Sequence, residues 1–538
     1  RLMSVTTSYP GIYIQELPSS SHAIQPAPTS ITAFVGYSHP YKTQAFDVAQ
    51  QIFSFSDYET YFGGLFSSGL IDASLARAVY QFFLNGGSNA YVVGLQPGVF
   101  GDASHPVVRF GTGSSDMAFH VTISSADATP VALLLITALD PTDVVPMAVQ
   151  ITNVKAATAS TPAAFDLIVT HGTRVETYRG GQLTDVWIKA VNGASALISI
   201  AAQNEASWGG KTPAAGTSKF PTSPTNLPAG FDALFSSDDF LNVFLSNSSL
   251  DNVEIFNLLL VPGVADNSVV SAALAFAERK RAFAILDPPP QAPASGSTTG
   301  NPKPIQEWMT GLPGGYILPQ SQNGALYFPY LVSNDPVTGN NIPMPPSGFV
   351  AGQYAQTDAN RGVWKAPAGL ANVVLNTAGP VPGGIMNDPQ QGVLNLDSIN
   401  CLRSFSGIGT VLWGARTLVA ANPAYQQSAY VPVRRMTLFI EQSLLASLRW
   451  VVFEPNDEPL WTAIKSSIES FLLSLFRQGA LQGATPSDAF QVKCDATTTT
   501  PDDQASGRVI IVVAFAPLKP AEFVIIKIAQ LAGQTAGA

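Results

Sequence analysis

Charged side chains are scarce in this sequence. Only 12% of its 538 residues are Asp, Glu, Lys or Arg, against about 25% in an average soluble protein. A monomer of this size normally keeps a more charged surface for solubility. The shortage therefore indicates that partner subunits cover much of the surface. The hydrophobic fraction of 46% is ordinary, and a chain of this length is expected to form about three or four domains.

Basic runs and cysteines are also few. The net charge is −10, and the longest basic run is Arg279, Lys280 and Arg281. Nucleic acid is therefore not expected as a partner, because neutralising phosphates needs a basic face. A polybasic membrane anchor is unsupported for the same reason. The two cysteines, Cys401 and Cys494, cannot build a disulfide framework, which favours folding in a reducing cytoplasm.

Long hydrophobic runs are missing as well. The longest, residues 509–516, is far too short to cross a bilayer, and residues 1–11 lack the apolar core of a signal peptide. We therefore expect synthesis and assembly in the cytoplasm, without direct insertion into a membrane.

Motifs for nucleotide binding and acyl transfer are absent or incomplete. The stretch Gly210-Lys211-Thr212 ends like a phosphate loop, but Glu205 stands where the first glycine belongs. A turn is the better interpretation. The sequence has neither a GxSxG elbow nor an SxxK motif, so the serine acyl-transfer templates fail.

Metal ligands and catalytic pairs are not evident either. Cys401 is best interpreted as a small buried hydrophobe, and Asp238-Asp239 as the start of a helix or a solvated loop. Ligand spacing is missing among the five histidines, which are His22, His39, His105, His120 and His171. We expect no enzymatic activity, no metal and no cofactor.

Strand and helix patterns alternate near both ends of the chain. Residues 12–17 form an apolar strand within an arm that is interrupted by prolines. A strand–helix–strand pattern follows over residues 30–95 and returns over 257–286. Between them, residues 96–205 read as a mainly β insertion and 206–230 as a linker or surface loop.

The last third of the sequence is the most regular. Amphipathic helices are predicted over residues 436–449 and 459–478, with Asp457 as the cap of the second. Strands are predicted over 507–516 and 523–528. Since the first is apolar on both faces, it must be paired to avoid aggregation.

Short motifs in a shared order resemble the phage tail sheath protein family. They cover roughly residues 1–95 and 325–530, whereas the middle of the chain matches poorly. The motifs are residues 9–16 (YPGIYIQE), 30–36 (SITAFVG), 345–348 (PPSG), 362–367 (GVWKAP), 399–403 (INCLR), 413–418 (WGARTL), 430–458 (YVPVRRMTLFIEQSLLASLRWVVFEPNDE), 479–483 (GALQG), 489–494 (AFQVKC) and 516–524 (APLKPAEFV).

The resemblance implies a multidomain fold of the α+β or α/β class. A discontinuous α/β core is built from both chain ends, with a mainly β inserted domain and extended terminal strand arms. The expected segments are 1–40 (N-terminal arm), 41–95 (first part of the core), 96–205 (outer β insertion), 206–395 (middle α/β domain), 396–520 (C-terminal sheath domain) and 521–538 (C-terminal arm).

The resemblance also implies a function. Sheath proteins of this kind stack as hexameric rings around an inner tube and contract to drive the tube through a target envelope. The implied partners are the chain itself, the tube protein, and baseplate and terminal cap proteins, within a phage tail or a tail-like particle that is released from the cell. The terminal arms would add strands to neighbouring subunits through Ile12, Tyr13, Ile14, Gln15, Phe523, Val524, Ile525, Ile526 and Ile528.

Two alternatives remain open at this point. The polar side of the helix over 459–478, with Lys465, Glu469 and Arg477, either contacts the tube or is an ordinary solvated face. The chain as a whole could instead be a non-contractile baseplate, tube or capsid protein, for which low charge and several domains would fit equally well. The single-chain layout looks more like phage tails and extracellular injection systems than like the two-chain type VI sheath.

Overall fold

The computed structural model describes residues 23–99, 108–112, 116–158, 161–227, 235–289 and 320–527. The chain divides into two compact units. The smaller unit consists of Arg1–Ala27 and Met436–Lys519, and the larger unit consists of Pro28–Arg435 and Pro520–Ala538.

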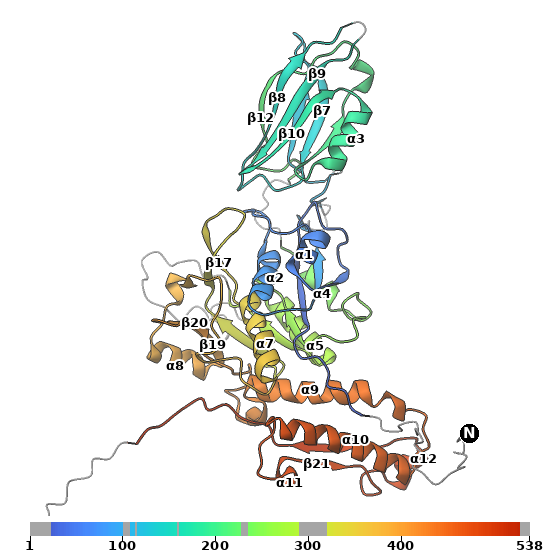
Figure 1. Cartoon of the computed structure of the whole chain (residues 1–538), viewed down its shortest axis with the longest axis vertical. Helices are drawn as coiled ribbons and strands as arrows, with labels where there is room; N and C mark the ends of the chain where they lie inside the picture. Colours follow the sequence, from blue (N-terminus) through green and yellow to red (C-terminus); the bar gives the residue numbers. More distant parts are fainter. Residues whose placement is uncertain are drawn as a thin grey trace, which may run out of the picture. The chain divides into compact units, whose positions relative to one another are not determined.

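An eight-stranded sheet forms the centre of the larger unit (Figure 1). Its six inner strands are parallel, and the edge strands β2 and β20 are antiparallel to their neighbours. Inner strands such as β1 are buried along their whole length, as expected for parallel strands covered on both faces. In spatial order the strands are β2 (Ala49–Ile52), β3 (Ala90–Leu95), β1 (Thr32–Tyr37), β13 (Leu258–Leu260), β14 (Phe283–Leu286), β15 (Gly324–Phe328), β19 (Ile399–Phe405) and β20 (Gly409–Leu412).

Helices cover both faces of this sheet. Helices α2 and α7 pack against each other and against β1, β13 and β14, while α4 and α5 pack together and contact β1, β3, β13 and β14. The strand order reverses direction between β1 and β13, so this is a doubly wound sheet. The described helices of this part are α1 (Phe55–Phe62), α2 (Ser74–Leu84), α4 (Ser237–Val243), α5 (Asn267–Lys280), α7 (Ser347–Arg361) and α8 (Asp388–Leu396).

Two antiparallel sheets make up the insertion that follows β3. One has the order β10-β9-β8-β12 and the other β11-β7-β6, and helix α3 packs on β10 and β11. Their bounds are β6 (His120–Ser124), β7 (Ala132–Ala138), β8 (Met147–Lys155), β9 (Ala164–His171), β10 (Arg174–Gln182), α3 (Asp185–Ala194), β11 (Ile198–Ala202) and β12 (Gly216–Lys219).

The β structure of the insertion continues past residue 205. Strand β12 lies within residues 206–230, and it pairs with β8 from Gly216↔Ile151 to Lys219↔Ala148. The prediction of a linker is therefore wrong at β12. Its four residues are mostly exposed, so they carry little of the apolar alternation by which a strand is recognised in sequence.

Short elements complete the larger unit. A three-stranded sheet has the order β17-β16-β18, and β4 pairs with β5. Their bounds are β4 (Gly98–Val99), β5 (Val108–Arg109), β16 (Leu331–Asn334), β17 (Asn341–Met344), β18 (Gly379–Pro380), η1 (Glu205–Ser207), η2 (Pro382–Gly384) and η3 (Pro423–Ser428).

The smaller unit is built on two helices and a hairpin. Helix α9 (Val431–Ser447) crosses the boundary between the units, which falls after Arg435. Helix α10 (Glu458–Arg477) confirms the predicted helix, and the side chain of Asp457 accepts from the backbone N–H of Leu460 as the predicted cap. The remaining elements are η4 (Arg449–Val451), α11 (Pro486–Ala489), β21 (Phe490–Lys493), α12 (Pro501–Ala505) and β22 (Val512–Phe515).

The two predicted C-terminal strands have different outcomes. The first is shorter than predicted, since only β22 is a strand, and it pairs with β21. The second, predicted over 523–528, has no strand partner in the part that is described, residues 523–527. Among the described helices, none is both long enough and apolar enough to cross a membrane.

Candidate assembly site at the anchored terminal segments

A partly buried carboxylate fixes the start of the C-terminal segment to the larger unit. Glu522 receives two parallel hydrogen bonds from Arg416, Nε to Oε1 and Nη2 to Oε2, both of 2.8 Å. The amide of Asn395 donates to Oε1 at 3.0 Å, and the hydroxyl of Tyr430 donates to Oε2 at 2.9 Å. Four donors on one carboxylate hold this part of the chain in a single position.

The protonation of Glu522 reflects these contacts. Burial alone raises the pKa of its carboxyl group, but the hydrogen bonds from Arg416, Asn395 and Tyr430 together hold the pKa below its usual range. The group therefore stays ionised at neutral pH, and the anchor is an ion pair with Arg416.

Beyond this anchor the chain is extended and apolar. Phe523, Val524, Ile525 and Ile526 have exposed fractions of 71%, 79%, 82% and 78%. Only Phe523 has a described contact, with the guanidinium of Arg416 at 5.9 Å from its ring centre. Four consecutive large apolar side chains in water are unfavourable for an isolated chain, so this segment is a candidate for contact with a partner.

The N-terminal segment is fixed within the smaller unit. The backbone N–H groups of Gln25 and Ala27 donate to the hydroxyls of Ser447 and Ser443 on α9, at 3.0 and 2.9 Å. The two hydrogen bonds match in spacing. From Ser443 to Ser447 the helix rises about 6 Å, and from Gln25 to Ala27 an extended chain spans about 6.6 Å. Ile24, the residue before this pair of bonds, is buried.

Within the larger unit, an arginine holds the segment that leads into β1. Nη2 of Arg435 donates to the backbone carbonyl of Thr29 at 2.9 Å. The same guanidinium forms a bidentate pair with Asp358, at 2.9 and 2.6 Å, and lies over the ring of Tyr354. Both charged side chains are only 3% exposed, so this pair is a fully buried tie between the segment, α7 and α9.

The hairpin of the smaller unit has room for further strands. Its two strands pair from Phe490↔Phe515 to Lys493↔Val512, and no third strand joins them among the described residues. Val512 and Ile510 are exposed apolar side chains on or beside β22. An open strand edge with apolar neighbours is a template for adding a strand from another chain.

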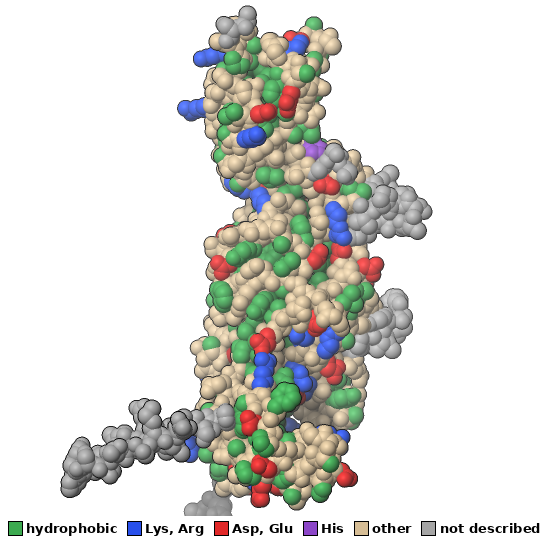
Figure 2. Space-filling model, turned by 90° about the vertical axis from the view of Figure 1, so that its right-hand side faces the viewer, with side chains coloured by type: hydrophobic (Ala, Val, Ile, Leu, Met, Phe, Trp, Pro, Cys, Tyr) green, Lys and Arg blue, Asp and Glu red, His purple; other side chains and the backbone are tan. Residues whose placement is uncertain are grey.

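The charged residues predicted on α10 are all at least partly exposed. Lys465 and Glu469 form an i,i+4 pair at 3.9 Å, with both side chains nearly half exposed. Arg477 is exposed in the last turn. Charged side chains are also scattered over the face drawn in Figure 2, so these three are not a unique feature.

Only part of the predicted arms can be placed. Ile12, Tyr13, Ile14, Gln15 and Ile528 lie outside the described residues. The anchoring residues Glu522, Arg416 and Ser443 were not singled out from the sequence, although Arg416 and Glu522 fall in the quoted motifs 413–418 and 516–524. Nothing in the sequence pairs them, because their contact depends on tertiary structure.

Another exposed apolar group was not anticipated from the sequence. Val452 and Phe453 follow η4, and their exposed fractions are 62% and 102%. The backbone of Phe453 has φ = 73°, a left-handed conformation that non-glycine residues rarely adopt.

The residues that were weighed as signs of nucleotide binding or catalysis have structural explanations. Lys211 of the phosphate-loop-like stretch pairs with Asp127 at 2.7 Å, and Asp238 and Asp239 lie in the first turn of α4. Cys401 is fully buried, and burial raises the pKa of its thiol to about 12. Within the described ranges, no three His, Cys, Asp or Glu side chains cluster as metal ligands.

Two family models match the chain. The model described as "Phage tail sheath protein central domain" matches residues 245–418, and "Phage tail sheath C-terminal domain" matches residues 424–530. Together they cover more than half of the chain, and they include α5, α7, α9, α10, the hairpin and the Glu522 anchor.

Curated relatives agree with these matches. A tail sheath protein of Vibrio phage KVP40 is 23% identical over 291 residues, which are 51% of this chain and 41% of the relative. A putative prophage major tail sheath protein of Pseudomonas aeruginosa is 26% identical over 280 residues, 51% of this chain and 65% of the relative. The aligned part thus spans less than two thirds of either relative.

Solved structures share the fold along nearly the whole chain. The sheath complex of an extracellular contractile injection system, PVC, in the contracted state has a TM-score of 0.57 at 21% identity, covering 98% of this chain and 99% of the other. The helical sheath of the anti-feeding prophage (AFP) in the contracted state has a TM-score of 0.54 at 22% identity, covering 98% and 100%. The predicted multidomain α/β architecture is thereby confirmed. From the two family models, the relatives and the shared fold, the chain belongs to the phage tail sheath protein family.

Proposed function

We propose that this chain is the structural subunit of a contractile sheath, and that its terminal segments join neighbouring copies by adding strands to their sheets. The observation that carries the proposal is the C-terminal segment, which is anchored at Glu522 and exposes four apolar side chains directly beyond the anchor. The family is one of structural sheath proteins, which supports a role in assembly rather than in catalysis.

The open-edged hairpin of β21 and β22 is the proposed acceptor. A strand added there gains backbone hydrogen bonds, and alternate side chains set its register. Each large apolar side chain that becomes fully buried contributes about 1.5–3 kcal/mol. Val452 and Phe453 offer a second apolar contact for a neighbouring copy.

The proposed assembly consists of hexameric rings stacked around an inner tube. Baseplate and terminal cap proteins are the proposed partners at its two ends, in a phage tail or a tail-like particle released from the cell. Similar solved structures include a baseplate and a contracted sheath complex, which supports a polymer of this kind. The side of α10 that carries Lys465, Glu469 and Arg477 is the proposed contact with the tube.

Contraction in this scheme needs no nucleotide. A bias of about 1.4 kcal/mol per subunit corresponds to a tenfold preference for one state, and coupling many subunits makes the change effectively one-way. The terminal segments, which are anchored at Glu522 and at Ser443, would keep neighbouring copies connected while the folded units move.

Electron microscopy of the purified chain, alone and with its tube protein, tests the proposal. We expect hollow striated cylinders. Deleting residues 523–538, which keeps the Glu522 anchor, should abolish the cylinders and leave a folded monomer, as judged by circular dichroism and size-exclusion chromatography.

A pair of substitutions refines this test. Val524→Ser with Ile526→Ser removes apolar side chains from one face of the segment and should prevent assembly. Val175→Ser with Val186→Ser changes two comparably exposed valines of the insertion and should leave assembly intact. Unchanged cylinders from the truncated chain would exclude strand addition through this segment, and particles without cylinders under all conditions would favour a non-contractile baseplate, tube or capsid role.

A further inference from the structure

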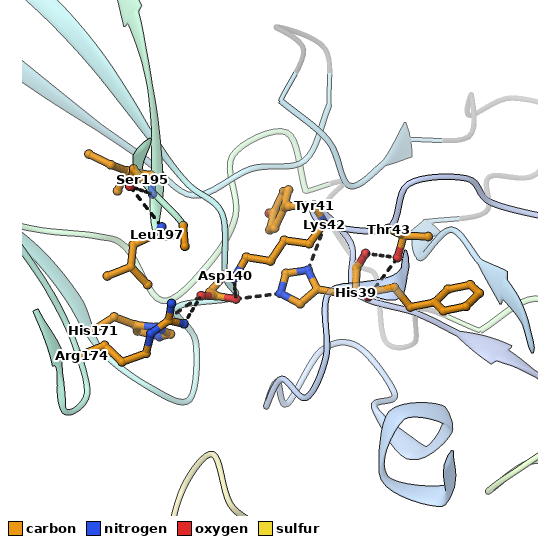
Figure 3. A network of polar contacts seen from close by, with 12 residues as sticks. His39, Tyr41, Lys42, Thr43, Asp140, His171, Arg174, Ser195 and Leu197 are labelled. Atoms are coloured by element: carbon orange, nitrogen blue, oxygen red, sulfur yellow. Dashed lines mark hydrogen bonds and ion pairs between the residues drawn. The ribbon is translucent and has the colours of Figure 1, made fainter. Parts of the chain in front are cut away.

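A polar cluster joins the β insertion to the doubly wound part of the larger unit. Asp140, which follows β7 of the insertion, meets residues from the loop after β1 (Figure 3). Oδ1 of Asp140 accepts from Nε2 of His39 and from Nζ of Lys42, both at 2.7 Å. His171, the last residue of β9, and Arg174, the first residue of β10, face Oδ2 at 3.7 and 3.6 Å.

The cluster is largely excluded from water. The side chain of His39 is fully buried, and those of Asp140 and His171 are 8% and 9% exposed. The rings of Phe66 and Tyr41 pack against the His39 ring, and Tyr41 in turn contacts Phe110 of the insertion. Charges in this place are therefore poorly solvated, and each added charge needs a partner.

The hydrogen bonds of His39 specify its neutral form. Its Nδ1 accepts from the backbone N–H of Tyr41 at 3.2 Å, so the ring proton sits on Nε2 and is donated to Asp140. A second proton would have to bind Nδ1, where it would face the Tyr41 N–H. Two donors cannot share that contact, so protonation of His39 breaks it.

His171 is also arranged as a neutral ring. Its Nδ1 faces Oδ2 of Asp140 at 3.7 Å, while its Nε2 is buried and has no hydrogen-bond partner among the described residues. A proton added at Nε2 would be a buried charge without an acceptor, which is costly. In this arrangement, neither histidine therefore has a hydrogen-bond acceptor for a second proton.

The surrounding charges do not compensate such protons. Lys42 and Arg174 already face Asp140, so protonating both histidines would place four cations around one carboxylate. Asp143, three residues after Asp140, accepts through Oδ2 from the hydroxyl of Ser68 and from the N–H of Gly69. Asp116 also acts on Tyr41, and burial raises the pKa of the Tyr41 hydroxyl far above neutral pH.

We propose that this cluster is an acid-sensitive joint, in which protonation of His39 and His171 releases the β insertion from the loop after β1. The joint is closed at neutral pH and opens on acidification. This proposal does not depend on the sheath function, since every group in it belongs to one chain.

The protonation equilibria agree with this direction. Burial lowers the pKa of both histidines, and Lys42 and Arg174 lower it further against the opposing effect of Asp140. Asp140 itself keeps a pKa of about 2, because the hydrogen bonds from His39 and Lys42 and the positive charge of Lys42 outweigh its burial, so it stays ionised throughout. Histidines with a lowered pKa bind protons more readily in the open state, so closure is fully favoured above about pH 6.5 and weakens as the pH falls.

Hydrogen–deuterium exchange of the full chain at pH 7.5, 6.0 and 5.0 tests the joint. Labelling times are scaled to the intrinsic rate at each pH, and peptides spanning residues 38–43 and 139–145 are followed. If the closed state excludes the proton, each imidazole raises the opening constant up to about 30-fold at pH 5.0. We therefore expect protection in both peptides to fall at least tenfold between pH 7.5 and 5.0.

Substitutions separate this effect from general acid unfolding. Each single change, His39→Gln and His171→Gln, should reduce the acid response, and the double variant should lose it, because glutamine keeps a donor and an acceptor but takes no proton. His120→Gln is the matched control within the insertion, where His120 contacts Thr137, and it should respond like the wild type.

Three outcomes would overturn the proposal. The first is unchanged protection of the wild type down to pH 5.0. The second is an equal loss of protection in peptides of the eight-stranded sheet, which would indicate global unfolding. The third is an acid response that survives in a folded double variant or that is undiminished in both folded single variants.

Discussion

At the scale of single residues, burial decides what an ion pair contributes to this fold. Arg435 and Asp358 are both 3% exposed, whereas Asp388, the partner of Arg403, is 88% exposed. A buried charge that loses its partner remains in a poorly polarisable interior, and an exposed one is solvated by water. The two pairs therefore make opposite predictions for the same substitution.

Asp358→Asn should destabilise the larger unit by about 3–5 kcal/mol, because it leaves the Arg435 guanidinium buried without its counter-charge. Urea unfolding followed by circular dichroism measures the effect. Asp388→Asn is the control and should cost less than about 1 kcal/mol. Equal effects of the two substitutions would contradict the assignment of the Arg435 pair as a buried tie.

The anchor at Glu522 should behave as a coupled pair with Arg416. A double-mutant cycle with Arg416→Ala and Glu522→Ala should give a coupling of about 1–2 kcal/mol at pH 7, since the pair is bidentate and mostly buried. The pKa of Glu522 is lowered from 4.5, so the coupling is complete above pH 4.5 and declines as the pH falls further. Additive single effects at pH 7 would show that the contact does not fix the segment.

At the scale of elements, the contact between α2 and α7 depends on glycines. A Cβ atom placed on Gly352 would lie 2.5 Å from Cβ of Asn85 and 2.8 Å from the carbonyl oxygen of Phe82. One placed on Gly348 would lie 2.4 Å from the carbonyl oxygen of Ala78. The two helix backbones therefore touch, and the glycines are required by distance rather than by conformation.

Gly352→Ala should separate the two helices and destabilise the larger unit by about 1–3 kcal/mol or more, because the clash involves backbone atoms that cannot rotate away. Gly392→Ala in α8 is the matched control. A Cβ at Gly392 meets nothing within 4 Å, so the substitution should be neutral or stabilise by up to about 1 kcal/mol. Thermal unfolding of both variants distinguishes these outcomes, and equal stabilities would refute the close contact.

At the scale of the whole molecule, the low charge and the exposed apolar segments both favour self-association. The chain exposes Phe453 and the segment 523–526 to water, and few charged side chains are available to keep copies apart. Self-association is the arrangement in which both features become favourable, because the apolar side chains are then covered.

Reversing charge on α10 tests the proposed tube contact. Lys465→Glu with Arg477→Glu should reduce co-assembly with the tube protein at least tenfold, as judged by co-sedimentation, while cylinders or monomers of the chain alone remain unchanged. Lys189→Glu with Arg179→Glu applies the same charge change to exposed positions of the insertion and should have no effect. Normal co-assembly of the α10 variant would mean that this side of the helix is an ordinary solvated surface.

The sequence by itself determined the elements with a strong apolar pattern. Strand β3 lies within the predicted strand–helix–strand pattern over residues 30–95, and α10 begins at its predicted cap, Asp457. Strand β12 was not predicted, because its mostly exposed residues carry no such pattern. The family could be inferred from sequence because many short motifs keep their order along the chain.

Only the tertiary structure decided which distant side chains meet. His39 and Asp140 are 101 positions apart, and Arg416 and Glu522 are 106 apart. The histidines lacked ligand spacing in the sequence, yet folding brings His39 and His171 to one carboxylate. Local patterning reports on a residue's exposure, because neighbouring residues share an element. It carries no information on which side chains from different elements come into contact, since that depends on how strands order in a sheet and where loops return.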